Sequence, residues 1–226
     1  MVVLAAPIAA LPQLLPDLAG CPGVVTDMAS TKTRVLRWAA AAGVDLVGGH
    51  SMCGSERSGI EAADPDLFLD APWVLIRDEP RVGDLMRAVG ATPLVMDPEL
   101  HDRLVAGVSH SAFLLSAAYV RSLAEEPEWE LMRLVGPGFR DMSRLAAGDP
   151  EFYAAVVATN REAILRSLSA VEASLAKLRR HVEAGDGCLV ELLEEAKRVR
   201  QRWASERAAP QRADAAPASS SSIPWS

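Results

Sequence analysis

The sequence predicts an α/β region with a mostly parallel sheet, followed by an all-α region. Two observations lead to this prediction. Up to residue 96, short and continuously apolar runs alternate with segments of helical spacing, and beyond Asp97 only helical spacing remains. The composition agrees with a folded chain, because 226 residues with 50% hydrophobic and 23% charged types are an ordinary globular balance.

The strand candidates of the first region are uninterrupted apolar runs, which are typical of strands buried on both faces in a parallel sheet. They cover residues 2–6, 23–27, 44–49, 73–77 and 92–97. Segments with helical spacing fall between them, at Ile8–Leu18, Lys32–Ala42, Glu56–Ala63 and Arg81–Val89. We therefore expect helices on both faces of the sheet, and we assign residues 1–96 to this domain.

The second region begins with Asp97 and Pro98, a favourable N-cap and first-turn pair, and a long helix is predicted from there to about Leu123. The Gly/Pro stretch of residues 136–141 should then break the helices. We assign residues 97–206 to a helical domain.

Apolar residues further along recur at steps of four and three, in two series joined by a turn at Gly185–Gly187. This pattern predicts an antiparallel helical hairpin whose apolar seam lies in a core or in a dimer interface. The seam consists of Ile164, Leu168, Val171, Leu175, Leu178, Val182, Leu189, Leu192, Ala196, Val199 and Trp203. Residues 207–226 are rich in Ala, Pro and Ser and are predicted to be a disordered tail.

Charge and composition exclude several classes of function. A net charge of −7 argues against a nucleic-acid binder held by phosphate contacts. The longest uncharged run, Leu104–Val120, is short for a membrane span and is interpreted as a helix buried in protein. The first residues imitate a lipoprotein signal ending at Cys21, but prolines interrupt them and no Lys or Arg precedes the cysteine. Three widely separated cysteines favour a reducing, cytoplasmic location.

The densest polar cluster of the first half, GGHSMCGSERSG (48–59), follows a predicted strand. Three chemistries compete for it. Ser51 could be a hydrolase nucleophile, but the elbow motif requires Gly two residues later, where Cys53 stands. His50 and Cys53 could hold a metal, although two ligands are a weak signal. His50 could be a general base at a strand end, with a structural histidine as the equal alternative.

Other candidate residues come from three further segments. In TDMASTK (26–32), Ser30 and Thr31 can cap a helix, or bind an anion or a substrate hydroxyl with the same groups. His110 lies on the uncharged helix and is more typical of a satisfied core residue. Arg140 and Arg144 follow the Gly-rich break, and arginine suits bidentate carboxylate binding, although a surface ion pair is the commoner role.

In order and spacing, these segments resemble the prephenate (or arogenate) dehydrogenase family. The resemblance extends from residue 2 to about 204 and depends on VVLAAPI, TDMASTK, VGGHSMCGSERSGIEAADPDLF, PWVL, MDPELHDRLVAGVSH, GFRDMSRLAAGDPEFY and NREAIL. It implies a partial Rossmann-type sheet followed by a helical dimerisation domain, which forms a homodimer. It further implies NAD or NADP as cofactor, no metal, and oxidative decarboxylation of prephenate to 4-hydroxyphenylpyruvate, or of arogenate to tyrosine.

The resemblance also implies residue roles. His50 would accept the proton of the ring hydroxyl during hydride transfer, and Ser30 would lie beside that hydroxyl and the nicotinamide. Arg144 would bind a substrate carboxylate, and His110, Arg140, Ser55 and Glu56 would be further substrate-binding residues. Pro7 and Ala29 would line the cofactor site together with Ser30.

Three departures from the family pattern stand out. GGHPMAGSE is replaced by GGHSMCGSE, and SHLPH by SHSAF, which puts Phe113 where a second histidine is expected. No G-x-G-x-x-G is present, and residue 2 resembles the start of the fourth Rossmann strand. We therefore expect poor NAD binding by residues 1–226. A start codon placed too late is favoured over a truncated gene, and a non-catalytic remnant that only dimerises is the alternative.

Overall fold

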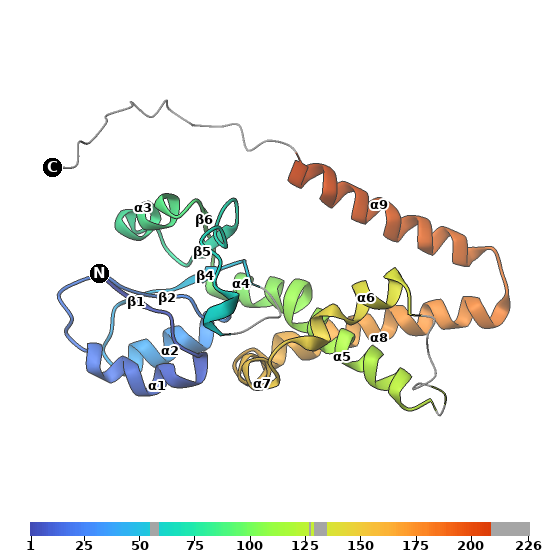
Figure 1. Ribbon diagram of the computed structural model, residues 1–226, viewed down its shortest axis with the longest axis horizontal. Coiled ribbons are helices and arrows are strands. Elements are labelled where there is room, and N and C mark those ends of the chain that lie inside the picture. Colours follow the sequence, from blue (N-terminus) through green and yellow to red (C-terminus); the bar gives the residue numbers. More distant parts are fainter. Residues whose placement is uncertain (55–58, 127, 129–134, 209–226) are drawn as a thin grey trace. The chain divides into compact units, whose positions relative to one another are not determined.

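The computed structural model describes residues 1–54, 59–126, 128 and 135–208 (Figure 1). Its contacts divide the chain into two compact units, Met1–Ala170 and Val171–Ser226, which are described separately. The first unit contains the sheets and most of the helices, and every candidate site residue lies in it.

The first sheet contains β1 (Val2–Leu4), β2 (Val25–Asp27) and β3 (Leu46–Val47), in that order and all parallel. Each strand lies within a predicted apolar run. The 3-10 turns and short helix η1 (Ile8–Ala10), α1 (Leu11–Leu14) and η2 (Leu15–Leu18) pack on it together with α2 (Thr33–Ala41). Leu11, Leu15 and Val35 are completely buried there, which accounts for the helical spacing of both segments.

The second sheet contains β4 (Gly49–Ser51), β5 (Pro72–Leu75) and β6 (Thr92–Val95), with β4 antiparallel and β6 parallel to β5. The chain passes from β3 to β4 through Gly48, so the single strand predicted over residues 44–49 is divided between two sheets. Helix α3 (Pro80–Ala88) buries Val82 and Met86 against this sheet. The prediction of a mostly parallel α/β region is confirmed, with β4–β5 as the antiparallel exception.

The helix predicted over Glu56–Ala63 is wrong in the part that the structure describes. Residues 55–58 lie outside the described residues, and a single 3-10 turn, η3 (Ile60–Ala62), follows Gly59. Gly59 has φ of 89°, a left-handed conformation that a regular helix does not continue.

A long helical stretch opens the second region, as predicted. Asp97 accepts hydrogen bonds from the backbone N–H groups of Glu99 and Leu100, and α4 (Pro98–Val105) starts there. A π-helical turn, η4 (Ala106–His110), joins α4 to α5 (Ser111–Ala124). Such turns hold one residue more than an α-helical turn and are frequent at functional sites.

This stretch, Pro98–Ala124, is long and apolar enough to cross a membrane by length and composition. A third of its most apolar window, 33%, is buried inside the protein. His101, Asp102 and His110 are among its buried residues, and each is hydrogen-bonded within the first unit. Buried, satisfied polar groups favour a helix that packs in a protein interior.

The remaining helices of the first unit are α6 (Pro137–Ser143), the 3-10 turn η6 (Arg144–Ala147), α7 (Pro150–Thr159) and the start of α8 (Arg161–Ala184). Helix α6 begins inside the stretch 136–141 that was expected to break the helices. Pro137 occupies the first helical position, where its missing N–H is no loss.

In the second unit, α8 continues to Ala184 and α9 (Cys188–Ala208) follows a turn in which Gly185 has φ of 61°. The turn was predicted correctly, but the two helices do not pack along their length as a hairpin would (Figure 1). Leu175, Val182, Val199 and Trp203 of the predicted seam are each at least half exposed. Residues 209–226, which were predicted to be disordered, lie outside the described residues.

Candidate active site

A buried ion pair fixes the loop between β2 and α2 to the start of β4. The Nζ atom of Lys32 donates to Asp27 Oδ2 at 2.5 Å and also to the carbonyl of Gly49. Asp27 accepts two further hydrogen bonds, from the N–H groups of Ala29 and Gly49, each at 3.0 Å. Lys32 and Asp27 are completely buried, so every charge is satisfied inside the protein.

Gly49 must be a glycine for this arrangement. A Cβ atom at position 49 would lie 2.5 Å from the carbonyl oxygen of Asp27 and 3.1 Å from Trp73 Nε1. The backbone of β4 therefore approaches β2 closely, and the next residue along β4 is His50.

His50 belongs to a buried row of polar side chains. Its Nδ1 atom lies 2.8 Å from His101 Nε2, and the Nδ1 atom of His101 lies 2.9 Å from Asp102 Oδ1. The Asp102 carboxylate in turn accepts the backbone N–H groups of Lys32 at 2.8 Å and Thr33 at 2.9 Å. His101 and Asp102 thus connect β4 to the N-terminus of α2.

His110 extends the cluster from the π-helical turn. Asn160, at the start of α8, donates to the backbone carbonyl of Asp102 at 2.7 Å and lies 3.3 Å from His110 Nδ1. The other ring nitrogen of His110, Nε2, is buried without a hydrogen-bond partner among the described residues, and so is the hydroxyl of the next residue, Ser111. Unpartnered buried polar atoms are uncommon, and they indicate that a polar ligand group or water belongs here.

Burial keeps both candidate histidines neutral. It lowers the pKa of His50 well below its usual value, and the positive charge of Lys32 acts in the same direction. Burial also lowers the pKa of His110 to about 4. For Asp102, burial raises the pKa, but the hydrogen bonds from His101 and from the backbone at Lys32 and Thr33 outweigh it, so the pKa is lowered. At neutral pH the cluster offers neutral imidazoles beside an ionised carboxylate.

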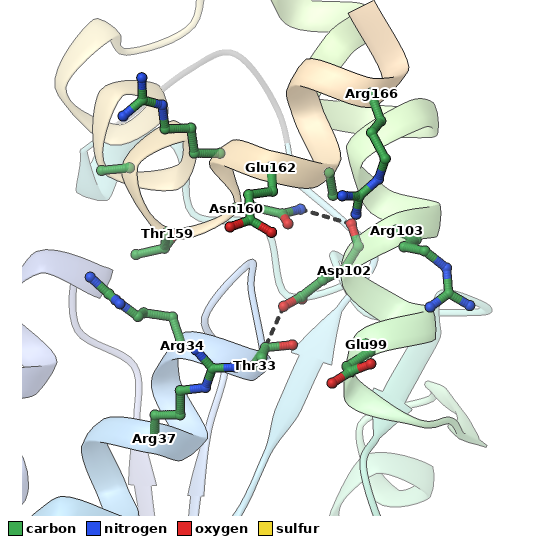
Figure 2. Close-up of a pocket in the computed structure, with 13 residues that line it drawn as sticks. Thr33, Arg34, Arg37, Glu99, Asp102, Arg103, Thr159, Asn160, Glu162 and Arg166 are labelled. Carbon is green, nitrogen blue, oxygen red and sulfur yellow. Dashed lines mark hydrogen bonds between the residues drawn. The ribbon is translucent and has the colours of Figure 1, made fainter. Parts of the chain in front are cut away.

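A cavity of about 450 Å³ borders the cluster on the side of Asp102 and Asn160 (Figure 2). Its walls come from α2, α4 and the junction of α7 and α8, and they carry the arginines Arg34, Arg37, Arg103, Arg161 and Arg166 together with Glu99 and Glu162. Of the expected site residues that the structure describes, none lines this cavity.

The residues expected to hold a cofactor lie at the carboxyl ends of two parallel strands. Pro7 follows β1, while Ala29 and Ser30 follow β2. This edge of a parallel sheet is where nucleotides bind in such folds. The sequence also predicted Ser30 or Thr31 as a helix cap, and that prediction is wrong, because the Asp102 carboxylate caps α2. Thr31 instead donates to the hydroxyl of Thr159 at 3.1 Å.

Two of the alternatives at residues 48–59 receive no support from the structure. Cys53 is a free cysteine, and the described residues that could jointly hold a metal are His181, Asp186 and Cys188, not His50 and Cys53. Ser51 has no histidine partner among the hydrogen bonds of the described chain. Ser55 and Glu56 lie outside the described residues.

Arg140 and Arg144 are exposed, on α6 and at the start of η6. The positive charge of Arg144 acts on Tyr153, whose pKa is raised by burial and lowered in part by this arginine. The Tyr153 ring stacks on Phe113, with centroids 3.5 Å apart and planes 7° apart. Phe113 is three residues after His110 on the same helical stretch. An aromatic stack therefore occupies the position where the family pattern has a second histidine.

Sequence reasoning missed Asp27, Lys32, His101, Asp102 and Asn160. The only available signal was the pair His101–Asp102 inside the motif MDPELHDRLVAGVSH, where a charged and a titratable residue adjoin apolar positions. Their partners are distant in sequence, at 70 residues in the case of Asp102 and Lys32.

The fold and site define a class of protein. It has an α/β domain of the nucleotide-binding type, a helical domain, and a buried histidine cluster to which both domains contribute residues. Comparisons with known proteins agree. The family model "Prephenate dehydrogenase, nucleotide-binding domain" matches residues 1–89, and "Prephenate dehydrogenase, dimerization domain" matches residues 97–195. The chain belongs to the prephenate dehydrogenase family.

Individual relatives give the extent of the similarity. The prephenate dehydrogenase of Lactococcus lactis subsp. cremoris is 30% identical over 89% of this chain and 60% of its own length. The structure of Aquifex aeolicus prephenate dehydrogenase in complex with hydroxyphenyl propionate and NAD+ has a TM-score of 0.81 at 28% identity, over 89% of this chain and 75% of that one. Synechocystis arogenate dehydrogenase has a TM-score of 0.72 at 29% identity, over 89% of this chain and 78% of that one. The chain thus spans 60% of the Lactococcus relative.

Proposed function

We propose that this chain carries the proton-accepting and substrate-binding part of an NAD(P)-dependent dehydrogenase that oxidatively decarboxylates prephenate to 4-hydroxyphenylpyruvate. The observation that carries the proposal is His50, a buried histidine kept neutral on the short strand β4 of a nucleotide-binding type of domain. A base with a lowered pKa can accept a proton at neutral pH, as oxidation of a ring hydroxyl requires. Membership of the prephenate dehydrogenase family supports this reaction.

In the proposed mechanism, His50 accepts the proton of the ring hydroxyl while the carbinol carbon loses hydride. Ser30, at the end of β2, holds the same hydroxyl from the cofactor side. A bound nicotinamide dinucleotide supplies the hydride acceptor, and the ring carboxylate leaves as CO2, so that its bonding electrons complete the aromatic ring. His110 offers its unpartnered Nε2 atom to a polar group of the substrate.

The described residues fit one end of the cofactor. Pro7, Ala29 and Ser30 lie at the carboxyl ends of β1 and β2, and the small side chains at positions 29 and 30 allow a flat ring to approach. Ser30 Oγ makes no recorded hydrogen bond within the described chain, so its hydroxyl remains available to a ligand. No G-x-G-x-x-G turn for the pyrophosphate occurs among these residues. NAD or NADP is therefore proposed without a choice between them.

Two carboxylates of prephenate require cations. Arg144 is proposed to bind one of them, since its charge acts on Tyr153 beside Phe113, on the helix that carries His110. Arg140, one helical turn before Arg144, is proposed to assist, and Ser55 and Glu56 are proposed as further substrate-binding residues. Arginine matches the planar carboxylate with two parallel hydrogen bonds.

A homodimer is proposed through the helical domain. The match to a dimerization-domain family supports it, as does the exposure of the apolar seam in the second unit. Large exposed apolar rows are typical of interaction surfaces. Residues 1–96 and 97–206 remain our proposed domain boundaries, and the free cysteines agree with a proposed cytoplasmic location.

The test is an assay of NAD(P)+ reduction and CO2 release with prephenate and with arogenate. Because residues 1–226 are expected to bind NAD poorly, the comparison uses the protein extended upstream of Met1, in which His50→Asn should lower kcat by about two orders of magnitude or more, the usual contribution of a general base. Ser51→Ala, which changes the neighbouring residue on β4, is the matched control and should retain activity. Equal turnover by the wild type and His50→Asn would remove His50 from the mechanism. Dimerisation without turnover of either substrate would favour the alternative of a non-catalytic remnant.

A further inference from the structure

The row of hydrogen bonds from α2 to His50 has a direction. Its first member is the Asp102 carboxylate, which accepts the backbone N–H groups of Lys32 and Thr33 at the N-terminus of α2. Figure 2 shows the bond between Asp102 and Thr33. A backbone N–H can only donate, and an ionised carboxylate can only accept. Asp102 Oδ1 must therefore accept from His101 as well, which places a proton on His101 Nδ1 at 2.9 Å.

The position of this proton determines the next one. A neutral imidazole with a proton on Nδ1 has an unprotonated Nε2. His101 Nε2 lies 2.8 Å from His50 Nδ1, so a hydrogen bond between them requires the proton on His50 Nδ1. The alternative, a doubly protonated His101, would place an imidazolium at 1% exposure, although two backbone N–H groups and the α2 dipole already stabilise the Asp102 charge.

We infer that His101 and Asp102 are positioning residues that hold His50 in one tautomer, with its proton on Nδ1 and its lone pair on Nε2. This inference rests on the proposed function only for its catalytic consequence. The Nε2 atom of His50 is then the proton acceptor toward substrate. When it accepts a proton, the new charge lies at one end of a row that terminates in the Asp102 carboxylate, which stabilises it through His101.

The charged groups around His50 agree with this role. Burial lowers the pKa of His50 most, Lys32 from the α2 side and His101 and His110 from the long helical stretch lower it further, and Asp102 alone raises it. His50 is therefore neutral at neutral pH, and a neutral ring has a tautomer to select. The exchange of an orienting aspartate for asparagine in serine proteases lowers kcat about 10⁴-fold through the wrong tautomer, which shows how large such a selection can be.

The first test is nitrogen NMR of the uniformly 15N-labelled full chain at pH 8. The chain has only four histidines, so His50 is assigned by its loss in His50→Asn. We expect a protonated Nδ1 and an unprotonated Nε2 for both His50 and His101. A His50 that carries its proton on Nε2 overturns the inference, and this measurement does not require turnover.

The second test replaces His101. His101→Phe keeps a ring of similar size but removes the acceptor, so His50 should shift toward the Nε2-protonated form that free histidine prefers. His181→Phe, in the other unit, is the matched control and should leave the His50 signals unchanged. An unchanged His50 tautomer in His101→Phe overturns the inference.

The kinetic arm separates this inference from the proposed function. With prephenate, His101→Phe should lower kcat at least roughly tenfold with little change in KM, and His101→Gln, whose amide oxygen can accept from His50, should recover part of the loss. The expected tautomer in a chain without turnover contradicts the proposed function alone. Turnover with the opposite tautomer, or full activity in His101→Phe, contradicts the positioning role alone.

Discussion

The polar cluster around His50 and the apolar seam of α8 and α9 depart from the usual distribution of residues in opposite ways. In the cluster, Lys32, Asp27 and His101 are almost completely buried. In the seam, leucine, valine and tryptophan side chains are exposed, and Leu175 reaches 64%. Buried charges are tolerated only when paired, and exposed apolar rows usually await a partner. The proposed active site rests on the first departure, and the proposed dimer rests on the second.

The largest expected effect on stability comes from removing the buried ion pair of the polar cluster. Lys32→Met should lower the free energy of unfolding by about 3–5 kcal/mol, because it leaves the Asp27 carboxylate buried without its counter-charge. Arg77→Met, which breaks an exposed pair with Asp45, is the control and should cost less than about 1 kcal/mol. Urea unfolding curves provide both values. Equal losses in the two variants would show that burial does not distinguish these pairs.

The pH dependence of stability probes the same cluster. His110 has a pKa of about 4 in the folded chain, against 6.5 for the free side chain. Between these values the unfolded chain binds the proton and the folded chain does not, so stability is full above pH 6.5 and falls as the pH falls toward 4. The loss should reach roughly 3 kcal/mol, and His50 adds to it in the same direction. His110→Gln should flatten the curve, and an identical slope in that variant would contradict the assignment.

A smaller effect is expected on the exposed side. Leu175→Glu should weaken the proposed dimer by about 10-fold to 100-fold, because it places a charge in an apolar contact worth about 1–3 kcal/mol. Lys177→Gln changes a charge on the same helix outside the seam and should leave the association constant unchanged. Sedimentation equilibrium measures both. A dimer that tolerates Leu175→Glu would place the interface elsewhere.

The smallest effect concerns the aromatic stack. Phe113→His restores the residue of the family pattern and should change the ratio of kcat/KM for prephenate and arogenate by about 3-fold to 10-fold, the value of one net hydrogen bond. Phe113→Leu keeps the position apolar and should leave the ratio unchanged. A ratio that responds equally to both would mean that ring packing on Tyr153, and not polarity, determines the preference.

Sequence patterns predicted those elements whose stabilising contacts lie close together in the sequence. Apolar runs located every strand except β4, and Asp97 marked the start of α4 because a cap bonds within one turn of its own chain. Asp102 was missed because it caps a helix 70 residues away in sequence, and no local pattern reports such a contact. Gly48 and the antiparallel β4 were missed for a related reason. The chain leaves one sheet after β3 and enters the other at β4. This transition depends on the close packing of Gly49 against Asp27 and Trp73, which is visible only in the folded structure.

The π-helical turn at Ala106–His110 contains one additional residue, and this residue determines the direction in which His110 points. In an unbroken α-helix, at about 100° per residue, His110 would face away from His101, nine positions earlier. The additional residue absorbed by the wider turn rotates His110 back by about 100°, so that it reaches Asn160. Deleting one residue here would restore a regular ladder of backbone bonds and remove an imidazole from the site. The number of residues between Val105 and Ser111 therefore determines, together with their identity, whether His110 reaches Asn160.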